Sequence, residues 1–529
     1  RNFKDLIIFL FTLINNEISN ILGLFTHTGK SHHMVFEPLL LKLAERGHNL
    51  TVASFFPASN PPSNYHEISF QGLHELGLES FDLKAYENSK IFKRIPRIGS
   101  IASQLLQFRP FAIASLSICE KLANFKPLLE ALKGDYDVVF LENFTSDCML
   151  GLIYAYGINA PIVSIMSGTP MPWSSERIGA NDNPSYVPLI TAPFSSRMTF
   201  MDRLENTLIN IILKEWYYNE IQTKERYILE KKFGEIQDLR ELGKNVSLML
   251  TNSYHTLNGV KPLVPGMVEV GGLHLTSKRE PLPQFIEKFL NDSSDDGVIL
   301  FSFGSLVKTK SLPKYKEQIF INALSKLKQR VIWKFEDSDE EGTLAGNILK
   351  VKWLPQYDLL YIAGHEKIIA FICHGGLLGM TEAMAAGKPM IVVPIFGDQF
   401  SNAAAAAEAG VGVVLPYDDL KEDILKYRFI LFSYNYSRMR THTRLVSKIW
   451  HDRDISPLDK AVFWTEHVIR WGMSTHLHST ARNLTFYQLT LLDVAAVIIF
   501  TISLLIIMII YLIYKLIHIF KKSTKEKLL

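Results

Sequence analysis

Cysteine is scarce in this sequence, and neither sign of charge predominates. The 529 residues include only three cysteines, Cys119, Cys148 and Cys373. So small and odd a number argues against a disulfide framework and against a zinc site built from thiolates. The 56 Lys and Arg residues nearly balance the 53 Asp and Glu residues, and the net charge is +3. Without a basic excess, no nucleic acid is expected as a partner, and a small molecule is the more natural ligand.

Short repeats and low-complexity segments are also lacking, so the chain is expected to fold into globular domains. A single hydrophobic core rarely serves 529 residues, and two domains with appendages are therefore predicted. Strand-like and helix-like runs alternate along the chain, beginning with Ile21–Thr26. This alternation is typical of α/β domains in which helices cover both faces of a parallel sheet. A second series of the same kind starts near Val268, where VEVGGLH reads as a strand.

The predicted organisation follows from these two series. Residues 1–20 form an incomplete signal peptide, 21–265 the first Rossmann-like domain and 266–445 the second. Helices return toward the membrane over 446–488, a transmembrane helix spans 489–514, and a basic tail occupies 515–529. The boundary between the two domains is placed in a segment rich in proline and glycine, residues 258–272.

Apolar runs at the two ends support this organisation. Near the start, basic residues precede a short apolar run that ends by Ile14, as in a secretory signal peptide; the alternative is a buried strand over Leu6–Ile14. Near the end, Val494–Tyr514 holds no charged residue and is long enough to cross a bilayer. Lysines follow it, which places that side in the cytoplasm. A type I membrane protein is expected, and its final KEKLL resembles the retrieval signal of endoplasmic reticulum membrane proteins.

One stretch near the end of the soluble part carries chemistry at strand ends. Residues 371–399 read FICHGGLLGMTEAMAAGKPMIVVPIFGDQ. A strand ends at His374, glycines including Gly376 follow, and a helix continues through Glu382. Backbone N–H groups at such a helix start favour an anion, for which a diphosphate is the natural candidate. Glu382 lies about two turns into the helix, where its carboxylate can accept hydrogen bonds from ribose hydroxyls.

Polar and aromatic residues follow other predicted strands. Trp353 and Gln356 can stack on a flat base and pair with its edge, although most tryptophans serve core packing. Gly304 and Ser305 suit contact with phosphate, and Asp398 with Gln399 can bind paired sugar hydroxyls. Because ligands of parallel sheets bind beyond the carboxyl ends of the strands, these groups are expected to share one site.

The whole stretch resembles the signature of the UDP-glycosyltransferase family, in its animal membrane-bound and arthropod-like branch. The residues in register with the signature are Gly375, Glu382, Pro389, Pro394, Asp398 and Gln399. The resemblance implies the GT-B type of α/β fold, with two Rossmann-like doubly wound domains facing a cleft. It also implies that Trp353 stacks on uracil, Gln356 contacts the nucleoside and Glu382 binds the ribose.

The same resemblance places Ser305, His374 and Gly376 at the diphosphate, and Asp398 and Gln399 at the donor sugar. Three positions depart from the family pattern: Cys373, Leu378 and Lys388. None of the three removes a principal donor contact. The donor is a co-substrate, UDP-glucose by the likeness to the arthropod branch, and no cofactor is expected.

The loop after the first strand supplies the expected catalytic base. Members of the family carry a Ser-His pair in this loop, and the resemblance implies that its histidine, His32, is the base. His27 and His33 are close in sequence and compete for the role. Imidazole titrates near neutral pH and can take the proton of an attacking hydroxyl. A carboxylate should orient it, and both Glu142 and Asp147 are candidates; Glu142 is preferred only slightly.

The implied reaction is an inverting transfer of a hexose to a small lipophilic acceptor at the lumenal membrane surface. No metal is expected, because the helix terminus can neutralise UDP; the Asp337-Ser338-Asp339 motif suggests Mn²⁺ but reads more simply as a solvated loop. Two other functions stay open: a catalytically silent binding protein with this fold, and a transferase that acts on a lipid. The sequence does not define the acceptor or the oligomeric state.

Overall fold

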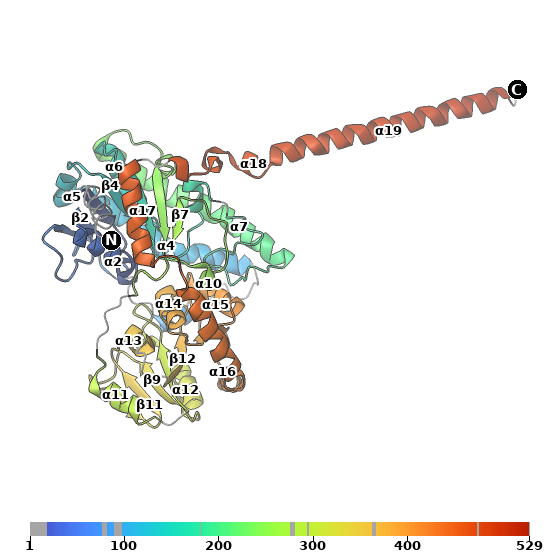
Figure 1. The fold of residues 1–529 in the computed structure, drawn as a ribbon. Coiled ribbons are helices and arrows are strands. Elements are labelled where there is room, and N and C mark those ends of the chain that lie inside the picture. Colours follow the sequence, from blue (N-terminus) through green and yellow to red (C-terminus); the bar gives the residue numbers. More distant parts are fainter. Residues whose placement is uncertain are drawn as a thin grey trace, which may run out of the picture. The chain divides into compact units, whose positions relative to one another are not determined.

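The computed structural model describes residues 18–76, 82–88, 98–180, 182–275, 281–293, 296–361, 367–472 and 475–527. All but the last three residues of the predicted signal peptide lie outside these ranges. The chain divides into two compact units, one that ends at His478 and one that begins at Ser479. The first unit contains two seven-stranded sheets, which are visible with their helices in Figure 1.

The first sheet is entirely parallel, in the order β3-β2-β1-β4-β5-β6-β7. Its strands are β1 (Asn20–Phe25), β2 (Asn49–Ser54), β3 (Tyr65–Ser69), β4 (Val138–Glu142), β5 (Ile162–Met166), β6 (Val246–Thr251) and β7 (Met267–Glu269). The strand order reverses between β1 and β4, which lie side by side. A doubly wound sheet binds its ligand at this point, beyond the carboxyl ends of the two strands.

Strand β7 corrects one prediction from the sequence. The run that begins near Val268 was expected to open the second domain, but β7 pairs with β6 and completes the first sheet, with Met267 opposite Met249. The first sheet therefore extends past residue 265. Local periodicity identifies a strand but cannot say which neighbour it pairs with, because the pairing depends on where the chain folds back.

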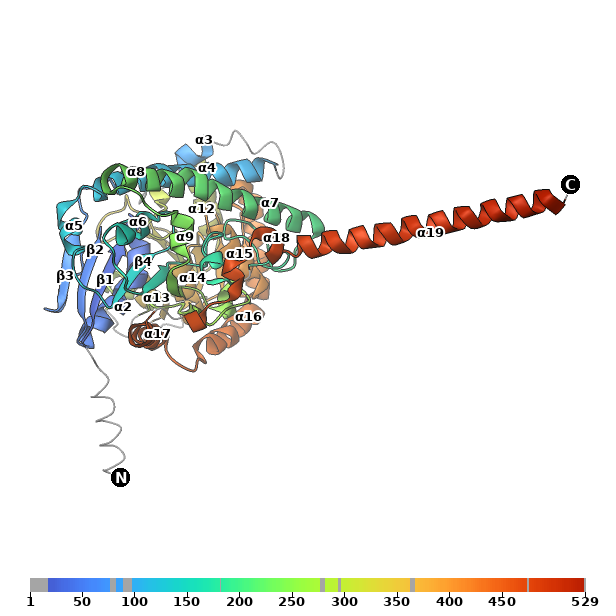
Figure 2. The same cartoon turned by 90° about the horizontal axis from the view of Figure 1, so that it is seen from above.

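Helices cover the first sheet, and Figure 2 shows α4 running beside α7 and α8. The α-helices of this half are α2 (Lys30–Glu45), α3 (Leu83–Asn88), α4 (Ile98–Leu122), α5 (Lys126–Ala131), α6 (Cys148–Ala155), α7 (Phe200–Tyr217), α8 (Thr223–Phe233), α9 (Leu239–Gly243) and α10 (His255–Asn258). Helix α2 begins at Lys30, earlier than the sequence suggested. His32 thus lies in the first turn of a helix and not in a loop.

The second sheet has the order β10-β11-β9-β8-β12-β13-β14, and its edge strand β10 is antiparallel. Its strands are β8 (Val298–Ser302), β9 (Arg330–Lys334), β10 (Thr343–Ala345), β11 (Ile348–Val351), β12 (Ile368–Cys373), β13 (Met390–Val392) and β14 (Gly412–Val414). The helices here are α11 (Gln284–Asn291), α12 (Lys314–Leu324), α13 (Gln356–Tyr361), α14 (Leu377–Ala385) and α15 (Gln399–Glu408). Strands β8, β11 and β12 end just before the polar residues singled out in the sequence.

Two long helices follow the second sheet. Helix α16 (Glu422–His451) crosses the boundary predicted at residue 445, and α17 (Pro457–Trp471) packs against α2 of the first half. Nε of Arg46 donates a hydrogen bond to Oε1 of Glu466 in α17, at 2.6 Å. The chain thus returns to the first domain, which ties the two halves of the first unit together.

The second unit contains α18 (Phe486–Leu489) and α19 (Leu492–Lys527). Within α19, Leu492–Lys521 is long and apolar enough to cross a membrane. This segment includes the predicted Val494–Tyr514. The structure therefore has, where the sequence predicted it, a helix that could span a membrane by its length and composition.

A disulfide joins Cys119 of α4 to Cys148 of α6, whose Cα atoms are 5.7 Å apart. The scarcity of cysteine correctly argued against a framework of several bridges but gave no sign of this single one. Cys373 is free and buried. The bridge closes a loop across 29 residues and ties α4 to the segment that follows β4.

Reduction of this disulfide is expected to lower the free energy of unfolding by about 3 kcal/mol, because the unfolded chain regains the entropy of an open loop. The measurement is urea unfolding of the full chain in detergent, comparing wild type with a Cys119→Ser, Cys148→Ser double variant. Cys373→Ser is the control, since it changes a buried cysteine without opening a loop. Equal stability of wild type and the double variant would contradict the expectation.

Candidate active site

The strand register brings His32 and Glu142 together. Parallel pairing of β1 with β4 sets Leu24 opposite Leu141, so the chain leaves both strands at the same edge of the sheet. Glu142 is the last residue of β4, and His32 lies in the first turn of the helix that follows β1. The Nδ1 atom of His32 contacts Oε1 of Glu142. These residues are 110 positions apart in the sequence.

Ser167 completes this cluster from the end of β5. Its Oγ lies 2.9 Å from Nδ1 of His32. Burial raises the pKa of Glu142 and lowers the pKa of His32, because each charged form loses hydration. An ionised Glu142 can only accept, so the pair fixes the proton of neutral His32 on Nδ1 and leaves a lone pair at Nε2. That is the form in which imidazole can act as a general base.

Asp147, the other candidate, does not contact His32. It precedes the first residue of α6. Its carboxylate accepts two hydrogen bonds from Arg177, at 2.9 and 2.7 Å, and one from Gln222 at 2.8 Å. Asp147 and Arg177 are both almost fully buried. Of the two carboxylates, the structure therefore brings only Glu142 to the imidazole, whereas Asp147 belongs to a buried ion pair of the fold.

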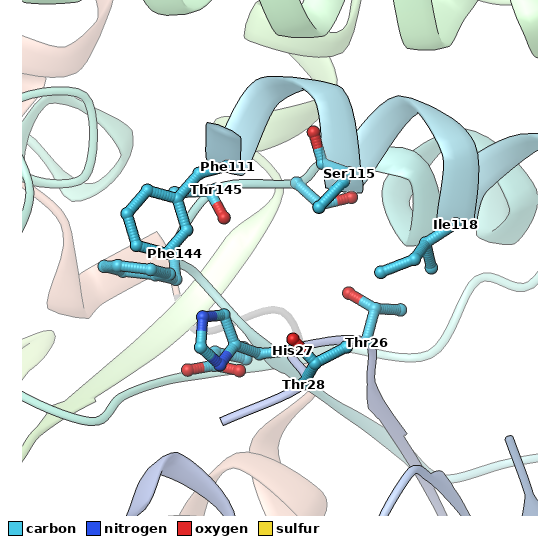
Figure 3. Close-up of a pocket in the computed structure, with 11 residues that line it drawn as sticks. Thr26, His27, Thr28, Phe111, Ser115, Ile118, Phe144 and Thr145 are labelled. Atoms are coloured by element: carbon cyan, nitrogen blue, oxygen red, sulfur yellow. The ribbon is translucent and has the colours of Figure 1, made fainter. Parts of the chain in front are cut away.

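A small pocket opens to solvent beside this pair. Its walls come from the β1–α2 connection, from α4 and from the segment after β4, and Figure 3 shows the rings of Phe111 and Phe144 above His27. Its lining is Thr26, His27, Thr28, Phe111, Ala114, Ser115, Ile118, Glu142, Phe144, Thr145 and Ser146. Aromatic and aliphatic walls with a few polar groups suit a small lipophilic ligand.

The glycines at the start of α14 make room for the ring of His374. A Cβ at Gly304 would lie 2.9 Å from Cε1 of His374, and one at Gly376 only 2.5 Å from Nε2. Gly376 is the N-cap of α14, and Ser305 follows Gly304 after β8. The imidazole thus packs between two backbone turns at neighbouring strand ends. Burial lowers the pKa of His374 to about 4, so the ring is neutral at pH 7.

Gln356 and Glu382 meet at the end of β11. The amide of Gln356 donates to Oε2 of Glu382 at 2.7 Å, and burial raises the pKa of Glu382 to about 7. His274 lies nearby, with Nε2 3.9 Å from the other oxygen of the carboxylate. Trp353 is 63% exposed. Its ring is therefore not a core side chain and is open to stacking.

Asp398 and Gln399 lie at the start of α15. The oxygen of the Gln399 amide already accepts from the backbone of Ile395 and Phe396, so only the NH₂ end of that side chain can bind a sugar. Asn402 donates to Asp398 at 2.8 Å, and burial raises the pKa of Asp398 to about 6.

Helix α4 connects this segment with the pocket. Gln107 of α4 accepts from the backbone N–H of Gly397 at 3.1 Å, next to Asp398. One turn further along α4, Phe111 lines the pocket beside His27. The single turn of α4 from Gln107 to Phe111 therefore connects the neighbourhood of Asp398 with the pocket beside the His32–Glu142 pair.

Two groups of side chains in the described ranges contain potential metal ligands. The Asp337-Ser338-Asp339 motif lies in an exposed loop, where Asp337 pairs with Lys310 at 3.5 Å. Within the described ranges, one set of three potential ligands lies close together: His27, His32 and Glu142. The two imidazoles stack with 3.9 Å between ring centroids and 13° between planes. A single ion cannot lie in both nearly parallel ring planes, so this arrangement does not suit a metal without rotation of a ring.

Comparison with known proteins identifies the family. The family model described as "UDP-glucoronosyl and UDP-glucosyl transferase" matches residues 23–527. UDP-glucosyltransferase 2 of Dactylopius coccus is 34% identical over 99% of both chains. UDP-glucuronosyltransferase 2B30 of Macaca fascicularis is 32% identical over 88% of this chain and 87% of its own. The Arabidopsis thaliana UGT89C1 structure, complexed with UDP-L-rhamnose, covers 86% of this chain and 99% of its own with a TM-score of 0.53 at 14% identity.

Two parallel-dominated sheets over this length define the GT-B class of glycosyltransferase fold. The chain belongs to the family of UDP-glucosyl and UDP-glucuronosyl transferases, and it is a UDP-glycosyltransferase. Fold class, family and enzyme class predicted from the sequence are thus confirmed.

Sequence reasoning missed two members of the site. Ser167 follows a predicted strand, and a polar residue at the end of a parallel strand was a usable signal. His27 was considered only as a rival base. Its stacking on His32 had no signal in the sequence, because four residues of loop and helix lie between the two histidines.

Proposed function

We propose that this enzyme transfers glucose from UDP-glucose to a hydroxyl group of a small lipophilic acceptor, with inversion and without a metal ion. The observation that carries the proposal is the contact of His32 with Glu142 at the edge of an aromatic-lined pocket. The acceptor oxygen forms a bond to the anomeric carbon of the sugar while the bond from that carbon to the UDP oxygen breaks. The hydroxyl proton passes to Nε2 of His32, and UDP leaves with the electron pair.

The donor is proposed to bind at the strand ends of the second sheet. Trp353 stacks on uracil, Gln356 contacts the nucleoside and Glu382 accepts from the ribose. Gly304, Ser305, His374 and Gly376 surround the diphosphate at the start of α14, where backbone N–H groups favour an anion. Asp398 and Gln399 bind the sugar. Direct displacement turns the α-linked donor into a β-linked product.

The proposed setting is the endoplasmic reticulum membrane. The apolar part of α19 spans the bilayer, and the lysines after it favour the cytoplasm for the tail, so the two sheets lie on the lumenal side. A lipophilic acceptor that partitions into the membrane is concentrated near such an enzyme.

The experiment is UDP release by membranes that carry the chain, with EDTA present. UDP-glucose, UDP-glucuronic acid and UDP-N-acetylglucosamine are each supplied with a panel of phenols and aliphatic alcohols. Acceptor-dependent release from UDP-glucose alone is expected. Release only from another donor would overturn the proposed sugar, and dependence on added Mn²⁺ would overturn the metal-independent reaction. Binding of UDP without any release would favour a silent binding protein.

Glu382→Gln is expected to weaken UDP-glucose binding about tenfold, because a hydrogen bond to a charged acceptor becomes one to a neutral acceptor.

In the wild type, affinity for UDP-glucose should rise between pH 6 and pH 8. Burial holds the pKa of Glu382 near 7, so acid protonates the carboxylate that accepts from the ribose. Titration calorimetry at several pH values measures both effects. Glu340→Gln, at an exposed carboxylate, is the control; equal affinities and pH slopes in all three proteins would remove Glu382 from the donor site.

A further inference from the structure

His27 has a fixed tautomer. Its Nδ1 accepts a hydrogen bond from the backbone N–H of Gly29 at 2.9 Å. A nitrogen that accepts carries no proton, so the ring is neutral and its proton is on Nε2. Gly29 also allows this position of the ring, because a Cβ there would come within 2.7 Å of Cε1 of His27. The backbone therefore holds the imidazole in one orientation.

The Nε2–H group of His27 is an unused donor. This nitrogen is buried and has no hydrogen-bond partner in the part of the chain that the structure describes. The centroid of the His27 ring lies 5.0 Å from that of Phe144, with 80° between the planes, and 6.3 Å from that of Phe111. Figure 3 shows the imidazole directed to the space beneath these two rings. Buried donors are nearly always satisfied, so an unsatisfied one that faces a pocket indicates a polar atom of a ligand.

The position of His27 relative to the base limits which atom that is. The two imidazole rings lie parallel, 3.9 Å apart, and Nδ1 of His32 is turned to Glu142. His32 must receive the proton of the attacking hydroxyl, whereas the Nε2–H of His27 can only donate. The oxygen of that hydroxyl could accept from His27, but a hydrogen bond to the attacking oxygen would lower its nucleophilicity. A second acceptor atom close to that oxygen is therefore the productive partner of His27.

We propose that His27 selects aromatic acceptors that carry a second oxygen on the carbon next to the attacking hydroxyl, such as 2-methoxyphenols and catechols. Nε2–H donates to this second oxygen, and the aromatic ring of the acceptor packs against Phe111 and Phe144. The inference rests on the proposed transferase function. It adds the chemical class of the acceptor and makes His27 a specificity-determining residue.

The test compares 2-methoxyphenol with 2-ethylphenol, which have similar size and acidity but differ by an oxygen in place of a CH₂ group. Wild type is expected to favour 2-methoxyphenol about tenfold in kcat/KM, the worth of one hydrogen bond. His27→Phe keeps a ring that can stack on His32 but lacks the donor, and should bring the ratio close to one by raising KM for 2-methoxyphenol. kcat/KM for 2-ethylphenol should fall less than kcat/KM for 2-methoxyphenol.

Two further variants separate recognition from structure. Gly29→Ala leaves His27 in the chain but crowds its ring, and it should also reduce the preference. Ser115→Ala changes another polar residue of the same pocket, whose hydroxyl already donates to the Ala112 carbonyl at 3.0 Å, and should leave the ratio of the two acceptors as in wild type. Thermal unfolding of each variant establishes that the fold is intact.

The outcomes distinguish this inference from the proposed function. Equal kcat/KM for the two phenols in wild type, or an undiminished preference in His27→Phe, would overturn the role of His27 while leaving the transferase in place. An equal loss with both phenols would make His27 structural. If no phenol supports UDP release, the proposed acceptor chemistry fails. In that case, ligand-observed NMR measures how tightly the two phenols bind to UDP-loaded protein. The ratio of their dissociation constants, compared between wild type and His27→Phe, then tests the role of His27.

Discussion

Replacement of His32 with alanine is expected to lower the turnover number by a factor of about 10² to 10⁴, the range that a positioned general base contributes. The variant removes the only imidazole that contacts Glu142 within the described ranges, and the attacking hydroxyl then has no group to take its proton. UDP binding should stay close to wild type, because the proposed nucleotide contacts lie on the second sheet. Steady-state kinetics with UDP-glucose and titration calorimetry with UDP measure the two effects separately.

His33→Leu is the matched control for this prediction. His33 is the next residue of α2, is 6% exposed, and packs against the rings of Phe25 and Phe56 without contacting Glu142. Leucine keeps most of that packing, so the turnover number should fall by less than about threefold. Glu142→Gln should lie between the two variants, since it keeps a hydrogen bond to Nδ1 but no longer stabilises an imidazolium. Full turnover in His32→Ala would exclude this residue as the base.

Replacement of Asp147 with alanine is expected to destabilise the fold by about 3–5 kcal/mol, because it leaves the guanidinium of Arg177 buried without its carboxylate. Arg177 is only 3% exposed and has no access to water that could replace the two lost hydrogen bonds. A loss of this size is a large part of the stability of a typical domain. The variant should therefore accumulate poorly and unfold at a much lower temperature than wild type.

A double variant tests whether the buried charge causes this loss. Asp147→Leu together with Arg177→Met replaces both partners by apolar side chains, and such exchanges are often neutral. Stability should then recover substantially, as measured by urea unfolding in detergent. The alternative, that Asp147 is the catalytic partner of His32, predicts the opposite pattern: Asp147→Ala would unfold like wild type and lose turnover. Glu142→Gln, by contrast, should lose turnover with an intact fold.

The residues proposed to bind the donor are the ones whose relative positions the sequence predicts more easily. His374, Gly376, Glu382, Asp398 and Gln399 lie within 30 residues of one another, on one strand–turn–helix unit and the turn that follows the next strand. Their relative positions are set by local geometry, which the spacing in the sequence encodes. The acceptor half draws on segments that are more than a hundred residues apart, and no local pattern reports their distances.

The sequence by itself determined the elements, the α/β class, the family and the membrane helix. Each depends on periodicity, on the length of an apolar run or on a continuous motif, all of which are properties of neighbouring residues. It also placed Glu142 and Asp147 near a strand end and favoured Glu142 only slightly.

Only the tertiary structure decided that choice. The register of β1 against β4 sets Glu142 beside the chain that leads to His32, while five residues later Asp147 turns toward Arg177. The same long-range packing joined Cys119 to Cys148, placed β7 in the first sheet and stacked His27 on His32. Contacts between distant segments arise from how strands pair and helices cover them, and a linear pattern contains no measure of that distance.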